Sequence, residues 1–130
     1  MKFNNFLLAS FLALAVVVSN GCVAPLLVVG AAGAGGYAYT TGKLVFTEGV
    51  TLDAAFKAAD QALRDLELTP EGKQKDTQTG TMEAKTAKDQ RVKVEVINKG
   101  AKITEIQIRV GVFGDEAYSR KIYERIKAHL

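Results

Sequence analysis

Histidine and cysteine are almost absent from this chain, and their scarcity excludes most common catalytic and metal-binding arrangements. Among 130 residues there is one histidine, His129, and one cysteine, Cys22. A single residue of each kind, at opposite ends of the chain, does not form a Ser-His-Asp or Cys-His nucleophile system. It also excludes transition-metal sites built on His and Cys ligands, and an intramolecular disulfide. We therefore expect the fold to be stabilised by packing alone.

Clustered carboxylates, the other common source of chemistry, are missing as well. No D-x-D spacing of the calcium-loop kind occurs in the sequence. His129 is expected to be a surface residue at a helix C-terminus, where a cation is favourable. We therefore expect no enzyme activity, no cofactor and no metal.

Charged residues are absent between Lys2 and Lys43. Lys2 precedes an apolar run over residues 6–18, and Ser19-Asn20-Gly21-Cys22 follows it. A positive start, a short apolar run and small residues at its end are typical of a secretory signal peptide. This stretch resembles the signals of bacterial lipoprotein precursors, although Ser19 stands where they usually carry an aliphatic residue.

The resemblance implies cleavage between Gly21 and Cys22, diacylation of Cys22 and attachment to the membrane of the bacterial envelope. Val23 stands where an aspartate would retain a lipoprotein in the inner membrane, which implies the outer membrane facing the periplasm. Two alternatives stay open. A signal peptidase could cut after Gly21 and release a soluble exported protein, or the uncharged region could remain as an anchor, since about 20 apolar residues span a bilayer.

We accordingly predict a signal peptide over 1–21, a lipidated cysteine with an apolar Gly/Ala-rich linker over 22–39, and one domain over 40–130. Gly33-x-Gly35-Gly36 lacks the strand, helix and acidic residue of a dinucleotide-binding loop. The linker is either a flexible tether or a segment that packs in the membrane through its small residues. In the second case Tyr37 and Tyr39 would lie at the membrane interface.

Residues 40–130 have the pattern of an α+β domain. Alternation of apolar and polar residues predicts strands over 43–48, 67–75, 81–87, 91–96 and 105–112. Helical spacing predicts helices after Thr51 and after Asp115, each of which is expected to be an N-cap. The predicted apolar stripes are Leu52, Ala55, Phe56, Ala59, Leu63 and Leu66 in the first helix, and Tyr118, Ile122, Ile126 and either His129 or Leu130 in the second. The i,i+4 ion pairs expected outside them are Asp53–Lys57, Asp60–Arg64, Glu116–Arg120 and Arg120–Glu124.

These elements predict a single antiparallel sheet of about five strands, in the order β-α-β-β-β-β-α along the chain, which resembles helix-grip domains. We expect both helices on one face and the other face polar. The strand order across the sheet should be 1-5-4-3-2, which places the strand that carries Pro70 at an edge.

The polar face carries basic residues, but they do not predict nucleic-acid binding. Glu95 and Glu105 interrupt them, and no aromatic residue alternates with them to stack on bases. The net charge of +3 is too small to indicate a partner. We expect cross-strand charge pairs instead, formed by the basic residues Arg91, Lys93, Lys99, Lys102 and Arg109.

Two features together resemble a family of small bacterial lipoproteins classed as a domain of unknown function. They are the glycine-rich linker after Cys22 and the run Arg-Val-Gly-Val-Phe-Gly-Asp-Glu over 109–116 that enters a helix. The resemblance implies a location and no activity.

For the function, we expect first a structural or protein-interaction module with an envelope protein as partner. The alternative is a carrier or sensor that holds an apolar ligand between helix and sheet, as some helix-grip domains do. The first is favoured because Phe56, Leu63, Ile122 and Ile126 are expected to fill that space. A cavity of several hundred Å³, on the scale of roughly 300–1,000 Å³ found in ligand sites, would reverse this order.

Overall fold

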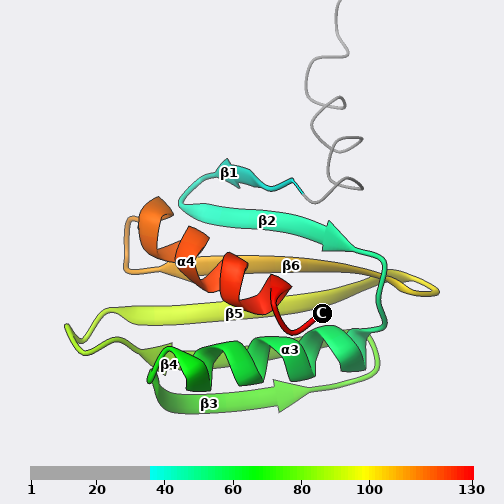
Figure 1. Cartoon of the computed structure of the whole chain (residues 1–130), viewed down its shortest axis with the longest axis horizontal. Helices are drawn as coiled ribbons and strands as arrows, with labels where there is room; N and C mark the ends of the chain where they lie inside the picture. The colour runs from blue at the N-terminus through cyan, green and yellow to red at the C-terminus, as the bar shows by residue number, and fades with distance from the viewer. Residues whose placement is uncertain (1–35) are drawn as a thin grey trace, which may run out of the picture. The chain divides into compact units, whose positions relative to one another are not determined.

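The computed structural model describes residues 36–130, which form one antiparallel sheet and two helices packed on it (Figure 1). The predicted signal peptide, the cleavage position at Gly21 and Cys22, and most of the linker lie outside the described residues. The elements are β1 (Ala38–Thr40), β2 (Lys43–Glu48), α3 (Leu52–Asp65), β3 (Thr69–Lys75), β4 (Thr79–Lys85), β5 (Arg91–Gly100), β6 (Ile103–Val110) and α4 (Glu116–Lys127).

The strands lie in the order β1-β2-β6-β5-β4-β3 within the described chain. The five predicted strands therefore have the expected order, and the strand with Pro70 is an edge. The expected number was wrong, because the sheet has a sixth strand. Ala38 pairs with Val45, and Thr40 with Lys43, so β1 adds to the side of β2 that was expected to be free.

The extra strand also shows where the tyrosines of the linker lie. Tyr37 and Tyr39 pack against the core, and the ring of Tyr37 lies 5.3 Å from that of Tyr123 on α4. Tyr123 in turn meets Phe46 of β2 edge to face at 4.7 Å. Both tyrosines therefore pack within the domain, and their aromatic side chains can be explained without a place at the membrane interface.

Both helices cover the same face of the sheet, as predicted (Figure 1). α3 packs on β4, β5 and β6, α4 packs on β2 and β6, and the two helices contact each other. Alternation in the strands supplies the core beneath them. The largest fully buried side chains of the sheet are Leu44, Phe46, Val92, Val94, Val96, Ile106, Ile108 and Val110.

The opposite face is polar, as expected, and some of its charges pair within β5 or between strands. Lys93 and Lys43 approach Glu95 at 2.9 and 3.6 Å, and Lys99 approaches Glu105 at 3.5 Å. The hydrogen bond from Lys93 is the main cause that lowers the pKa of Glu95. Arg91, Lys102 and Arg109 were also expected to pair, but they form no ion pair with another described residue. The charges of this face are therefore balanced only in part within the sheet.

The predicted N-caps are both present. The Thr51 hydroxyl accepts a hydrogen bond from the Ala54 amide at 3.3 Å, and the Asp115 carboxylate accepts one from the Tyr118 amide at 2.9 Å. In α3 the stripe holds, with Phe56 and Leu66 only partly buried. In α4 it is rotated, because Ser119 and Tyr123 are buried while Tyr118 is only partly so.

Two of the expected surface ion pairs are not found in the described part of the chain. Asp53 pairs with Lys75 of β3 rather than with Lys57, because the edge strand lies beside the first turn of α3. Arg120 pairs with Glu116 at 3.1 Å and lies over the Tyr37 ring, and the described residues show no Arg120–Glu124 pair.

His129 is exposed just beyond the C-terminus of α4, as expected, and it also contacts the other helix. Its Nε2 atom lies 2.6 Å from Oδ2 of Asp65, at the end of α3. This hydrogen bond is the main cause that lowers the pKa of Asp65.

Between residues 36 and 130, no helix has the length and apolar character needed to cross a membrane.

Candidate functional site

A groove opens between α3 and the edge strand β3, and it is the candidate site. Its volume is about 490 Å³. We call it the α3–β3 groove. Its lining residues are Asp60, Leu63, Arg64, Leu68, Pro70, Gly72, Lys73, Met82, Glu83 and Ala84.

The groove forms because the helix layer ends before the sheet does. α3 packs over β4 and its inner neighbours, whereas every residue of β3 is exposed. The sequence of β3, Thr-Pro-Glu-Gly-Lys-Gln-Lys, offers no large apolar side chain for a helix to bury. A bulge between Pro70 and Gly72 also interrupts the regular pairing with β4. The edge strand is therefore part of the sheet but not of the core.

The ring of Phe56 fills the space at one end of the groove. This ring lies so close to Gly80 of β4 that a Cβ on that glycine would come within 2.4 Å of it. At this end of α3 the space between helix and sheet is filled, as the sequence predicted. Further along the helix the facing strand residue is Ala84, whose small side chain leaves the space open.

The floor of the groove is apolar. Leu63 and Leu68 come from α3 and the turn after it, and Met82 and Ala84 from β4. All four are buried. A methionine in such a wall adapts readily to different shapes, since its side chain is unbranched and polarisable. The floor thus suits a hydrocarbon more than a polar group.

The charged residues that line the groove are two cations, Lys73 and Arg64, and two carboxylates, Asp60 and Glu83. Lys73 reaches across from β3 to Oδ1 of Asp60 at 3.2 Å, and Arg64 approaches Oδ2 of the same carboxylate at 3.0 Å. The side chains of Lys73 and Arg64 are both substantially exposed. The formal charges of the lining balance, and Lys73 and Arg64 both pair with Asp60. An acidic group can therefore pair with these two cations only in competition with Asp60.

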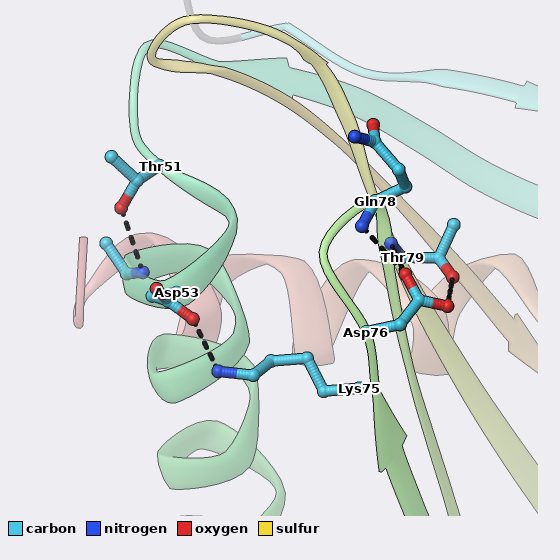
Figure 2. A network of polar contacts seen from close by, with 7 residues as sticks. Thr51, Asp53, Lys75, Asp76, Gln78 and Thr79 are labelled. Atoms are coloured by element: carbon cyan, nitrogen blue, oxygen red, sulfur yellow. Dashed lines mark hydrogen bonds and ion pairs between the residues drawn. The ribbon is translucent and has the colours of Figure 1, made fainter.

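A second ion pair joins β3 to α3 near the start of the helix, as Figure 2 shows. Lys75 of β3 pairs with Asp53 in the first turn of α3, and its ammonium lies 5.6 Å from the centre of the Phe56 ring. This pair lies outside the groove lining and holds the edge strand close to the helix.

The hairpin that carries β3 and β4 is held by Asp76. Its carboxylate accepts hydrogen bonds from the amides of Gln78 and Thr79, at 2.7 and 2.8 Å, and from the Thr79 hydroxyl at 3.1 Å (Figure 2). The Gln78 amide is the main cause that lowers the pKa of Asp76. The turn thereby fixes the two strands that form the floor and the outer wall.

Sequence reasoning did not predict this site. The pair Asp60–Arg64 was correctly expected, but only as a solvated i,i+4 pair, and Lys73 was not singled out. The site residues that the sequence predicts, Gly21 and Cys22, lie outside the described residues. Within residues 36–130, no three His, Cys, Asp or Glu side chains come together as a metal site would require.

Comparison with known proteins gives a family but no activity. A family model described as "Protein of unknown function (DUF3568)" matches residues 5–129. No curated protein matches the chain.

Proposed function

The chain belongs to the DUF3568 family, and from that premise we propose that it is a lipid-anchored bacterial envelope protein whose domain binds an apolar ligand with an acidic group. The signal-like residues 1–21 and Cys22 support the anchor, and Val23 supports the outer membrane facing the periplasm. The α3–β3 groove is the observation that carries the binding half of the proposal. Its volume of about 490 Å³ is typical of small-molecule sites.

The size of the groove reverses the order of the two functions considered from the sequence. A protein-interaction module was favoured because side chains were expected to fill the space between helix and sheet. Phe56 does so at one end, and Ile122 and Ile126 lie in the core. Leu63 is buried as well, and the α3–β3 groove remains open beside it.

The edges of the sheet give the interaction module little support. Strand addition at β3 is hindered by Pro70, by the bulge that follows it, and by the lysines Lys73 and Lys75. β1, at the other edge, has three residues.

The chemistry of the groove points to an amphiphile of the fatty-acid type. An apolar chain in the groove would contact Leu63, Met82 and their neighbours where they line it, and most of the water displaced would leave the surface of the ligand itself. A carboxylate at the mouth would pair with Lys73 and Arg64, which share Asp60 in the free protein. We propose binding without catalysis, because these groups pair with one another and no further ionisable group lines the groove except Glu83.

Charge reversal at the mouth tests this proposal. We expect the full chain to bind oleate more tightly than oleyl alcohol, which has the same hydrocarbon chain and no charge. Lys73→Glu should weaken oleate binding by about tenfold, equivalent to about 1.4 kcal/mol, and leave oleyl alcohol unaffected. Titration calorimetry measures both ligands.

Lys57→Glu is the matched control, since it makes the same change on an exposed position of α3 outside the groove. Equal losses in Lys57→Glu and Lys73→Glu would show a general effect of net charge and not a site. Absence of binding by either ligand would exclude the amphiphile.

A further inference from the structure

Two apolar side chains stand out on the surface between β6 and α4. Val112 is 79% exposed and Phe113 is 92% exposed. No other large apolar residue of the described chain is as exposed as these two. They are adjacent in sequence, and Gly111 and Gly114 flank them with φ values of +73° and +86°. A phenylalanine left in water forgoes roughly 1.5–3 kcal/mol of burial. We call Val112 and Phe113 the apolar tip.

The apolar tip is held in place by its surroundings. A Cβ on Gly114 would come within 2.5 Å of Gly42 in the turn between β1 and β2, so the two backbones are in direct contact. The Gly111 amide donates to the carbonyl of Arg91 at 2.7 Å, and the Arg109 guanidinium donates to the carbonyl of Val112. The fold thus presents these side chains outward in a defined position.

The distance along the chain to Cys22 limits how far the tip can lie from the anchor. Gly42 follows Gly36 by six positions, and Gly36 follows Cys22 by 14 positions. At about 3.5 Å per residue, 14 positions reach at most about 50 Å, and six reach about 20 Å. A domain anchored at Cys22 therefore keeps the tip within reach of the same membrane.

The charges around the tip suit an anionic lipid surface. Arg91 and Arg109 flank it, and neither forms an ion pair with another described residue. The nearby acids are engaged, because Asp115 caps α4 and Glu116 pairs with Arg120. Anionic headgroups attract basic side chains at a membrane surface.

We propose that the apolar tip inserts into the surface of the membrane to which the chain is anchored, so that Val112, Phe113 and the lipid on Cys22 hold the domain at two points. This inference rests on the lipid anchor of the proposed function. It does not depend on ligand binding in the α3–β3 groove.

Fluorescence of a single tryptophan tests the contact, since the chain has no tryptophan of its own. Phe113→Trp is placed in the full lipidated chain on vesicles of phosphatidylethanolamine and phosphatidylglycerol. We expect its emission to shift to the blue and to be quenched when the acyl chains are brominated. Ile103→Trp is the matched control, because Ile103 is also exposed but begins β6, whereas the tip follows the end of that strand.

Each outcome decides something. Quenching of Phe113→Trp without quenching of Ile103→Trp supports the proposal. Equal quenching of both, or of neither, on a chain that floats with the vesicles overturns the contact and leaves the anchor intact. A chain that does not float overturns the anchor and this inference together. A blue shift that needs concentrated protein and no vesicles would show that a second copy covers the tip, and would overturn the membrane contact.

Discussion

At the scale of single residues, Asp76 shows how one carboxylate can make the stability of a hairpin depend on pH. Its hydrogen bonds from Gln78 and Thr79 stabilise the ionised form and lower its pKa below the ordinary value of 3.8. In the unfolded chain these bonds are lost and the pKa returns to that value. The carboxylate therefore contributes stability that is fully present above about pH 4 and is lost as the pH falls through the lower pKa of the folded state.

We predict that Asp76→Asn lowers the free energy of unfolding at neutral pH and reduces its further loss as the pH falls below about 4, because the substituted residue no longer titrates. Urea unfolding at several pH values measures this. Glu67→Gln is the control, since Glu67 forms no side-chain hydrogen bond or ion pair with another described residue. An acid-induced loss in Asp76→Asn as large as in the Glu67→Gln control would contradict the assignment.

Single residues also show why the groove escaped sequence reasoning. Asp60 and Arg64 form a helical pair that the sequence predicts, and nothing local says that the same carboxylate also meets Lys73 from β3. The filled end of the groove depends on Phe56 facing Gly80, and the open part on the small side chain of Ala84. Such pairings are set by the register between a helix and a strand, which the sequence does not encode locally.

At the scale of elements, α4 depends on the cap at its N-terminus. Asp115 accepts from the Tyr118 amide, so Asp115→Ala should lower the free energy of unfolding by about 0.5–2 kcal/mol. Oleate binding should change no more than this loss of stability explains, because Asp115 does not line the groove. Thermal and urea unfolding give the first quantity, and calorimetry gives the second.

Glu116→Gln, in the same turn but not capping, is the control for this substitution. Should Asp115→Ala keep full stability and yet lose vesicle contact or ligand binding, the junction before α4 would be a functional site and not a cap.

Most elements could be predicted because their patterns are local. The valines of β5, the isoleucines of β6 and the caps at Thr51 and Asp115 each follow from spacing within one segment. β1 could not be predicted, since three residues next to a Gly/Ala-rich stretch carry no clear alternation. It forms through pairing with β2 and through Tyr37 meeting Tyr123, both of which are tertiary contacts. The rotated stripe of α4 has the same cause, because Tyr123 turns inward to meet Phe46.

At the scale of the whole domain, the α3–β3 groove and the apolar tip lie at different edges of the sheet. The groove lies along β3, which is one edge, while the tip contacts the turn between β1 and β2 at the other. Both lie toward the same end of the strands, because Pro70 pairs with Ala84, Ala84 with Val92, and Val92 with Val110 at the end of β6.

The anchor at Cys22 is the premise for the membrane contact of the tip, and fatty-acid labelling tests it most directly. Cells that express the wild type or Cys22→Ser are grown with a labelled fatty acid, and the protein is isolated and its mass determined. We predict label in the wild type only, and an unprocessed Cys22→Ser chain that keeps residues 1–21, because cleavage follows lipid attachment. Two or more acyl chains then hold the wild type stably in the membrane. Equal labelling of the two proteins, or no label in the wild type, would contradict the lipid anchor.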